Sequence, residues 1–375
     1  MTAWWLPVVF VAALCVAALA TPMVVRLALA LDVVDRPNER KVNLRPRIPL
    51  MGGLAVALGF FVGLAAALLI IPRELATPRL EALLAGGSLV LGVGALDDRW
   101  GLSALPKLVV QIAAAAVAIA FGFQIDHLTD PISHSVIHFP TWLVWVVTTL
   151  WIVLVTNSIN LIDGLDGLCT GISAIIAATL TVIAWQGGHV PGVIMGVALV
   201  GALLGFLPFN FPPARIFVGD TGALFIGYCL ALLALEGYQR VTVITFIVPL
   251  LALAVPLIDT GLSIVRRLRK RSRIMQADRM HIHHRLLSEH RGSHRPAVLS
   301  LYFLTACFCI IAVSFTRLQG YASIVFLVVI VLLTLRILRN LGFFDVREPE
   351  LPLVPGGEPQ QESERGLARV EGKSQ

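Results

Sequence analysis

Long runs of apolar residues constrain this chain more than any other feature of its sequence. A hydrophobic run of about 17–25 residues has the length that one α-helix needs to cross a lipid bilayer. Such runs recur along the chain, and 57% of the 375 residues are hydrophobic whereas 14% are charged. The sequence therefore predicts an all-α, polytopic membrane bundle of about 10–11 transmembrane helices. The expected helices lie near 4–30, 50–71, 80–96, 106–122, 141–156, 168–186, 191–208, 222–236, 243–265, 297–315 and 320–339.

Lysine and arginine are distributed unevenly between the loops that join these helices. Because positive residues collect on the cytoplasmic side of membrane proteins, the side with more of them is expected to be cytoplasmic. The amino terminus is then outside and the carboxy terminus is cytoplasmic. The same bias accounts for the net charge of +6, so the composition gives no separate case for binding nucleic acid. The expected cytoplasmic loops are 31–49, 97–107, 157–167, 209–221 and 266–296.

The chain is expected to form one membrane domain, residues 1–340, followed by a disordered cytoplasmic tail. The tail, residues 341–375, is rich in Pro, Gly, Glu and Gln, a composition typical of disorder. No basic segment precedes the first span, so we expect it to remain uncleaved. Trp4 and Trp5 suit the outer interface of the bilayer, where aromatic rings collect.

A polar stretch, Asn157–Leu168, interrupts the apolar sequence near the middle of the chain. Asn157, Asn160 and Asp163 recur every three residues, so they are expected close to one face of a helical turn. Uncompensated polar groups are costly at a membrane, so they either cap helices in water or take part in chemistry at its surface. Spacing alone leaves two hypotheses open, which are a shelf for a polar ligand and two helix ends with Asx caps and a glycine turn.

Carboxylates stand at two further helix ends on the expected cytoplasmic side. Asp97 and Asp98 are adjacent at the end of the third expected helix, and Lys107 begins the fourth. Two anions with a nearby lysine suit a site for metal and phosphate, although a solvated turn is the simpler alternative. Asp220 lies between two glycines, and it is expected either to cap a helix or to share Mg²⁺ with a diphosphate.

The most basic loop, 266–296, combines an arginine-rich run with a cluster of histidines. If this cluster is helical, His281, His284 and Arg285 share a face and His283 points elsewhere. No cysteine or spaced fourth ligand accompanies the histidines, so contacts to phosphate and sugar are favoured over zinc.

Two other loops carry charged or titratable residues. The first cytoplasmic loop, 32–49, is either a positive anchor or a docking place for a lipid phosphate or nucleotide. The loop at 123–140, which contains His127, His134 and His138, is expected outside as a loop or short hairpin rather than as a metal site.

Four of these polar segments, taken in order, resemble the motifs of a known family. The motifs are Asp97-Asp98, Asn157-x-x-Asn160-x-x-Asp163-Gly-x-Asp166-Gly-Leu, Asn210-x-x-Pro-Ala-x-x-Phe217-x-Gly-Asp220-x-Gly and His281-Ile-His283-His284-Arg285. Over roughly residues 20–340 the chain resembles the polyprenyl-phosphate N-acetylhexosamine-1-phosphate transferases. The resemblance implies a bundle of ten or eleven helices with a cytoplasmic cleft. There, undecaprenyl phosphate or a similar lipid would attack the β-phosphorus of a UDP-sugar and release UMP, beginning the synthesis of an envelope polysaccharide.

The resemblance also implies a role for each matching residue. Asp220 and Asn160 would hold Mg²⁺, with Mn²⁺ as an alternative metal, and the resemblance implies that Asp97 and Asp98 activate or position the lipid phosphate. The expected catalytic residues are Asp97, Asp98, Asp220 and His281. The expected substrate-binding residues are Lys107 for the diphosphate, Asn157 and Asp163 on the polar shelf, Gly164, Leu165, Asp166, Asn210 and Phe217 for uridine, and His283, His284 and Arg285 in the closing loop.

Details of the motifs favour one donor sugar. The pattern His281-Ile-His283-His284 resembles the GlcNAc-1-phosphate enzymes rather than the MurNAc-pentapeptide translocase, which has three consecutive histidines. We therefore expect UDP-GlcNAc, with another UDP-N-acetylhexosamine or UDP-MurNAc-pentapeptide as alternatives. Gly101 stands where some of these enzymes have a further Asp, and Asn43 stands where family members often have His, so lipid phosphate binding differs in detail.

Two hypotheses without this chemistry are a membrane transporter and a catalytically silent scaffold. A transporter would place its acids near mid-bilayer and in repeated positions, whereas these acids cluster at the expected cytoplasmic ends. A decayed scaffold would not keep complete acid, amide and histidine sets. The implied partners are therefore polyprenyl phosphate, a UDP-N-acetylhexosamine and the bacterial inner membrane, and a homodimer stays open.

Overall fold

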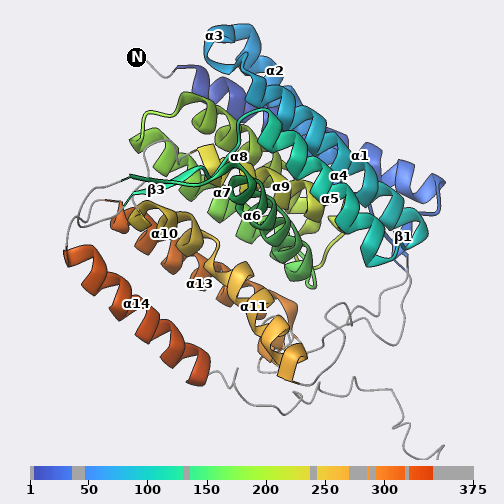
Figure 1. Cartoon of the computed structure of the whole chain (residues 1–375). Coiled ribbons are helices and arrows are strands. Elements are labelled where there is room, and N and C mark those ends of the chain that lie inside the picture. The colour runs from blue at the N-terminus through green and yellow to red at the C-terminus, as the bar shows by residue number, and fades with distance from the viewer. Residues whose placement is uncertain are drawn as a thin grey trace, which may run out of the picture.

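The structure, a computed structural model, describes residues 4–35, 47–129, 136–236, 243–269, 285–287, 290, 293–316 and 321–340. Asn43, His134, His281, His283, His284 and the tail 341–375 lie outside the described residues, so the expectations for them stay predictions. Within the described part, eight helices are long and apolar enough to cross a membrane. The predicted polytopic helical bundle is therefore confirmed (Figure 1).

Helices form nearly all of the regular structure in the described residues. Two short antiparallel ribbons pair β1 (Val34–Asp35) with β2 (Ile48–Pro49) and β3 (His127–Thr129) with β4 (Val136–His138). The helices are α1 (Trp5–Ala30), α2 (Gly53–Ile70), α3 (Pro72–Leu75), α4 (Pro78–Trp100), α5 (Ala104–Ala120), α6 (Thr141–Ile162), α7 (Leu168–Gln186), α8 (Val190–Asn210), α9 (Gly219–Glu236), α10 (Val243–Ala252), α11 (Ala254–Arg269), α13 (His294–Phe315) and α14 (Tyr321–Asn340).

Three helix boundaries differ from the sequence prediction in ways that matter for function. The expected span 243–265 is not one helix, because α10 and α11 are separated at Leu253. Pro249 and Pro256 flank the break, and each lacks the N–H that a continuous helix needs. In addition, α4 continues to Trp100 and α9 begins already at Gly219. Asp97 and Asp98 therefore lie in the last turn of α4, and Asp220 lies in the first turn of α9.

Helix α9 runs through the centre of the bundle, where α2, α4, α6 and α7 pack around it (Figure 1). Apart from Asp220, all of its residues are buried. Glycines allow the neighbouring helices to approach its first turn. A Cβ at Gly94 of α4 would press on the backbone of Asp220, and a Cβ at Gly53 of α2 would press on Gly222. The position of Asp220 is thus fixed by close backbone packing.

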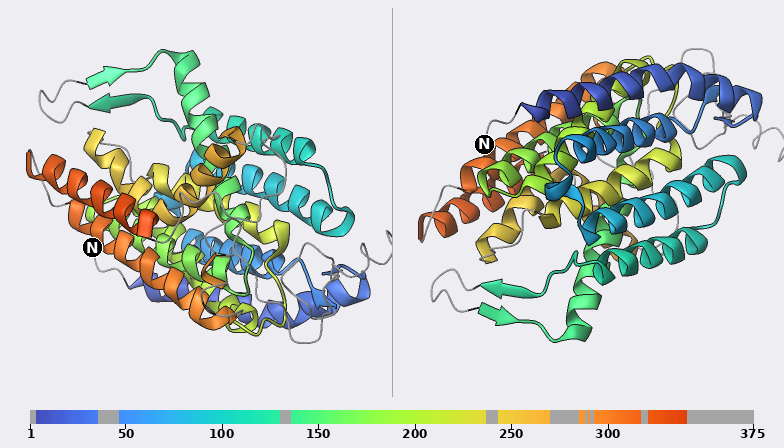
Figure 2. Two further views of the ribbon diagram at one scale, coloured as in Figure 1. Left: turned by 90° about the horizontal axis from the view of Figure 1, so that it is seen from below. Right: turned by 90° about the horizontal axis from the view of Figure 1, so that it is seen from above.

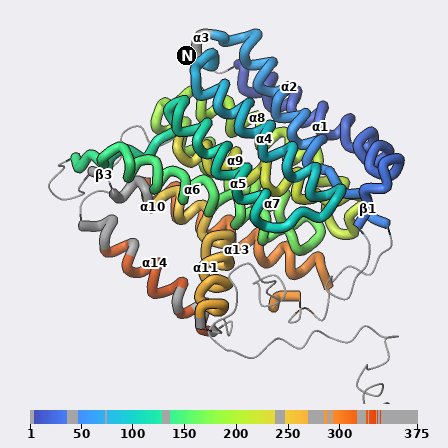
Figure 3. The backbone as a smooth tube through the Cα atoms, turned by 45° about the vertical axis from the view of Figure 1, so that its right-hand side comes forward, coloured from blue at the N-terminus to red at the C-terminus, as the bar shows by residue number. Residues whose placement is uncertain are grey.

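Different elements lie at the two ends of the bundle. The amino terminus, α3 and the β3–β4 hairpin lie at one end, whereas β1 lies at the other (Figure 3). The hairpin confirms the expectation of a loop or short hairpin at 123–140, and it projects away from the helices (Figure 2). His127 and His138 are cross-strand partners with ring centroids 5.7 Å apart. Nowhere in the described ranges do three or more His, Cys, Asp or Glu side chains form a group that could hold a metal by themselves.

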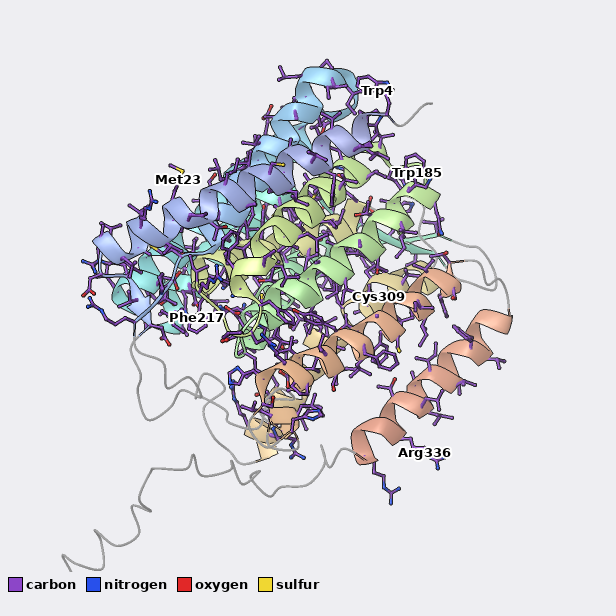
Figure 4. All side chains as sticks on the ribbon, turned by 180° about the vertical axis from the view of Figure 1, so that it is seen from behind. Trp4, Met23, Trp185, Phe217, Cys309 and Arg336 are labelled. Carbon is purple, nitrogen blue, oxygen red and sulfur yellow. The ribbon has the colours of Figure 1, made fainter. Side chains whose placement is uncertain are left out.

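Two exposed tryptophans lie at the end that carries the hairpin. Trp4 and Trp185 are 62% and 53% exposed, and both lie at the end opposite Phe217 (Figure 4). Trp4 therefore fits the predicted interfacial position. Trp5 does not, because its side chain is 5% exposed and belongs to the buried core.

A buried ion pair closes the hairpin end of the bundle. Arg79 of α4 lies 3.2 Å from the carboxylate of Glu236, the last residue of α9. The guanidinium of Arg79 also lies 5.6 Å from the ring centroid of Phe123. Glu236 is 4% exposed, so this contact is largely withdrawn from water.

We predict that Glu236→Leu destabilises the protein by about 1–3 kcal/mol, the contribution of a charge-assisted hydrogen bond. Glu236→Gln should cost less, because its amide oxygen still accepts a hydrogen bond from Arg79. Thermal unfolding of both variants in detergent measures the difference. An unchanged melting temperature for Glu236→Leu would show that the pair contributes nothing to stability.

Candidate active site

Four polar helix ends meet at the end of the bundle opposite the hairpin. They are the last turn of α4, the first turn of α5, the last turns of α6 and the first turn of α9. The ammonium nitrogen Nζ of Lys107 lies 3.0 Å from Asp97 Oδ2 and 2.7 Å from Asp220 Oδ2. Asn160 donates from Nδ2 to Asp220 Oδ1 at 3.0 Å. The structure thus brings together four residues that the sequence places on separate segments.

One cation between two anions defines the electrostatics of this cluster. Asp97 and Asp220 would repel each other if both were ionised without a positive charge between them. Their side chains are 13% and 27% exposed and that of Lys107 is 21% exposed, so water screens the three charges only partly. The remaining Asp97 oxygen, Oδ1, accepts a hydrogen bond from the backbone N–H of Leu102 at 2.6 Å. Asp97 is therefore held rigidly toward Lys107.

Asp98 points away from this cluster and toward the start of α9. Its Oδ1 accepts the backbone N–H of Asp220 at 2.8 Å, and its Oδ2 accepts the N–H and hydroxyl of Thr221 at 3.2 and 2.6 Å. These are the N–H groups that a helix leaves unpaired at its amino terminus, and a carboxylate there is also favoured by the helix dipole. Gly219 has a φ of +69°, and a Cβ at this position would collide with the Asp98 carboxylate. The structure therefore separates the adjacent acids, giving Asp98 the geometry of an anchor for Asp220.

We predict that Asp98→Asn lowers both the turnover rate and the melting temperature. Asparagine keeps one acceptor oxygen, whereas the anchor uses two, so the first turn of α9 loses at least one hydrogen bond and Asp220 shifts. A loss of turnover with an unchanged melting temperature would contradict this role and would favour Asp98 as a proton acceptor. Thr221→Val, which removes only the hydroxyl donor, should show both effects more weakly.

An amide pair, Gln111 and Asn157, joins α5 to α6 next to the charged cluster. Gln111 lies one turn after Lys107 on α5 and is 2% exposed. Its side chain exchanges hydrogen bonds with Asn157 in both directions, and Asn157 also donates to the carbonyl oxygen of Val153 at 2.8 Å. Asn157 was predicted to bind substrate, yet its amide is engaged with Gln111 and α6. This geometry locks α5 to α6 and so keeps Lys107 and Asn160 in register.

The segments predicted to bind uridine are joined through side chain to backbone hydrogen bonds. Asp166 Oδ2 accepts the N–H of Ala214 at 2.9 Å. Asn210 donates to the carbonyl of Ile216 at 2.9 Å and accepts the hydroxyl of Thr170 at 2.7 Å. Asp166 and Asn210 are both buried, at 5% and 2% exposed. Their side chains therefore fix the course of residues 211–218.

The other residues predicted to bind uridine, Gly164, Leu165 and Phe217, differ in their exposure. Gly164 is exposed, whereas the Leu165 side chain is 4% exposed and packs in the core. Phe217 is partly exposed, and its backbone is held on both sides, donating to Pro49 O and accepting from Gly52 N, each at 2.9 Å. The end of the first loop is thus tied directly to the site.

Asp163 follows the last turn of α6, in the loop at 163–167. Burial, followed by the negative charges of Asp220, Asp98 and Asp166, raises the pKa of Asp163 well above its usual range. A cation bound among these carboxylates would lower this pKa again. Arg285, the described member of the histidine cluster, is partly exposed.

The donor set of the cluster fits a hard divalent cation. Mg²⁺ takes oxygen ligands and commonly binds one or two protein carboxylates together with substrate phosphates. Asp220 supplies a carboxylate, and rotation of the Asn160 amide would present its oxygen in place of the nitrogen. Asp220 and Asn160 therefore fit the predicted metal ligands, provided that phosphate completes the coordination.

Several residues that shape the site were not predicted. Gln111 left a signal, because it is a buried polar residue in an apolar helix one turn from Lys107. Thr221 lies within a predicted motif. Thr170, Arg295 and Tyr302 gave no signal, because each bonds to a segment far away in the sequence: Thr170 to the Asn210 side chain, and Arg295 and Tyr302 to backbone carbonyls.

Comparison with known proteins gives consistent matches. Residues 80–238 match the model of the family described as Glycosyl transferase family 4. The chain is 36% identical over 334 residues to the "Probable undecaprenyl-phosphate N-acetylglucosaminyl 1-phosphate transferase" of Bacillus subtilis (strain 168), covering 89% of this chain and 91% of that protein. It is 37% identical over 307 residues to the decaprenyl-phosphate N-acetylglucosaminephosphotransferase of Mycobacterium tuberculosis (strain ATCC 25618 / H37Rv), covering 76% of each. It is 29% identical over 292 residues to the undecaprenyl-phosphate alpha-N-acetylglucosaminyl 1-phosphate transferase of Escherichia coli (strain K12), covering 73% of this chain and 74% of that protein.

The fold and site define a polytopic membrane protein with a cluster of charged side chains suited to phosphate chemistry. The chain belongs to Glycosyl transferase family 4, and within it to the polyprenyl-phosphate N-acetylhexosamine-1-phosphate transferases. The predicted family is therefore confirmed. This membership favours the enzyme hypothesis over the transporter and the silent scaffold.

Proposed function

We propose that the protein transfers GlcNAc-1-phosphate from UDP-GlcNAc to undecaprenyl phosphate or a similar polyprenyl phosphate. An oxygen of the lipid phosphate forms a bond with the β-phosphorus of the donor. The bond between that phosphorus and the oxygen bridging to the α-phosphorus breaks, and UMP leaves with the electron pair. The products are polyprenyl-diphosphate-GlcNAc and UMP, so the reaction begins a lipid-linked polysaccharide.

The observation that carries this proposal is the position of Asp220 between Lys107 and Asn160. Phosphoryl transfer asks little covalent chemistry of a protein and depends on neutralising and aligning anions. Lys107 already joins the first turn of α9 to Asp97. When a diphosphate enters, Lys107 can pair with it, and Asp220 and Asn160 would hold Mg²⁺ or Mn²⁺, which supplies positive charge to the phosphate oxygens.

Asp97 is proposed to position the lipid phosphate rather than to deprotonate it. A phosphate monoester is already largely ionised near pH 7, so it needs no strong base. The two hydrogen bonds on Asp97 hold it beside Lys107, where it can fix the direction of the ammonium group. Residues 163–167 and 211–218 are proposed to bind the uridine.

The site is proposed to face the cytoplasm of a bacterial inner membrane. Support comes from the excess of lysine and arginine on the loops at this end and from the bacterial origin of the relatives. The amino terminus and the hairpin would then face outside.

The test is product formation by the purified protein with undecaprenyl phosphate, Mg²⁺ and a panel of UDP-sugars. The panel contains UDP-GlcNAc, other UDP-N-acetylhexosamines and UDP-MurNAc-pentapeptide. UMP release together with labelled lipid in the presence of UDP-GlcNAc is the expected result. Product formed only with a different UDP-sugar would show that UDP-GlcNAc is not the donor. Folded protein that makes no product with any donor would contradict the proposal.

We predict that Asp220→Ala abolishes turnover and its dependence on Mg²⁺ while the protein still inserts and folds. The reason is that Asp220 supplies the carboxylate of the proposed metal site and the partner of Lys107. Asp126→Ala is a control, since Asp126 is an acid that lies 2.7 Å from Nδ1 of His127 at the hairpin, and it should leave turnover unchanged. Mg²⁺-dependent turnover retained by Asp220→Ala would refute the metal assignment.

A further inference from the structure

Helix α13 begins at His294, within the last residues of the expected basic loop, and packs on α7, α10 and α11 (Figure 1). None of the residues predicted to be functional lies on it. Two of its side chains nevertheless form hydrogen bonds with the backbone of 163–167 and 211–218, the segments proposed to bind the uridine nucleotide. These two contacts give α13 a direct connection to the candidate active site.

The first contact joins Tyr302 to the loop at 163–167. The Tyr302 hydroxyl donates to the carbonyl oxygen of Gly167 at 2.5 Å. The ring reaches this position because Gly171 of α7 has no side chain, and a Cβ there would overlap the ring and hydroxyl of Tyr302. Gly167 itself has a φ of +74°, which favours glycine, so the direction of its carbonyl is set by the backbone.

The second contact joins Arg295 to the segment at 211–218. The guanidinium Nε of Arg295 donates to the carbonyl oxygen of Pro212 at 2.8 Å. The two held segments also touch each other, because a Cβ at Gly167 would lie 3.1 Å from Phe211 Cα. Tyr302 and Arg295 therefore hold two segments, 163–167 and 211–218, that contact each other.

The charged cluster lies on other helices. Asp97, Lys107 and Asp220 belong to α4, α5 and α9, and the hydrogen bonds described for their side chains go to one another, to Asn160 and to Leu102 N. A change on α13 should therefore disturb the nucleotide segments and leave the cluster in place. This separation makes the role of α13 measurable.

We propose that Tyr302 and Arg295 are positioning residues for the nucleotide half of the site. They orient the Gly167 and Pro212 carbonyls and thereby order residues 163–167 and 211–218 for the uridine nucleotide. The proposal rests on the function proposed above for the donor.

The test compares Tyr302→Phe, Arg295→Lys and Gly171→Ala with the wild-type protein. The first removes the hydroxyl donor, the second keeps the charge but removes Nε, and the third displaces the tyrosine ring. Each should raise KM for UDP-GlcNAc about three- to tenfold, the effect of losing one hydrogen bond. The kcat, the KM for undecaprenyl phosphate and the Mg²⁺ concentration for half-maximal activity should change less than about twofold, since the cluster stays intact.

Tyr228→Phe is the matched control. Its hydroxyl is also hydrogen bonded, to the carbonyls of Ala82 and Ala114, but Tyr228 lies within α9 away from the nucleotide segments. Tyr228→Phe should lower stability to a similar extent without raising KM for UDP-GlcNAc. An equal rise in KM in this control would overturn the proposal, because it would show that any loss of packing has that effect.

Amide hydrogen exchange gives a second measurement that does not depend on turnover. The three α13-contact variants should exchange faster at residues 163–169 and 211–218, and Tyr228→Phe should not. Unchanged exchange and unchanged KM would overturn the proposal while leaving the proposed function standing. A wild-type protein without turnover on any UDP-sugar would instead contradict the proposed function, and faster exchange in the variants would still show that Tyr302 and Arg295 order these segments.

Discussion

The ammonium group of Lys107, placed between the carboxylates of Asp97 and Asp220, is the interaction on which the site depends. It joins three helices whose polar ends meet at one end of an apolar bundle. Two partly buried carboxylates without a shared cation would repel each other and separate these helix ends. The same ammonium group is positioned to pair with a diphosphate. The arrangement that holds these helix ends together is therefore also the arrangement that prepares the site for an anionic substrate.

The rest of the fold serves to hold this cluster in place. Helix α9 is buried along its length and approaches α2 and α4 through glycines, so its first turn cannot drift. Asp98 caps that turn from α4, and the Gln111–Asn157 pair locks α5 to α6 below it. Together these contacts preorganise the positive charge and the metal ligands, and preorganised groups need little rearrangement when the transition state forms.

Most of the fold and part of the site could be predicted from the sequence, because their signals are local. The apolar runs predicted the membrane helices, and the ordered motifs predicted the family. The prediction of one helix over 243–265 was wrong, because a hydropathy pattern does not show where prolines remove backbone donors and interrupt a helix. Adjacent acids gave no sign that Asp97 and Asp98 point in different directions, because that depends on where α9 begins. Tyr302 could not be predicted, because its partner is a backbone carbonyl far away in the sequence.

We propose that, when the diphosphate is present, Asp220 and Asn160 together hold a divalent cation while Lys107 pairs with the diphosphate. Binding of Mn²⁺, followed by electron paramagnetic resonance on the purified protein with and without UDP-GlcNAc, tests this most directly. The account predicts that the wild-type protein binds Mn²⁺ tightly only with UDP-GlcNAc present and that Asp220→Asn loses this binding. Equal Mn²⁺ affinity in Asp220→Asn, or tight Mn²⁺ binding without the nucleotide sugar, would contradict it.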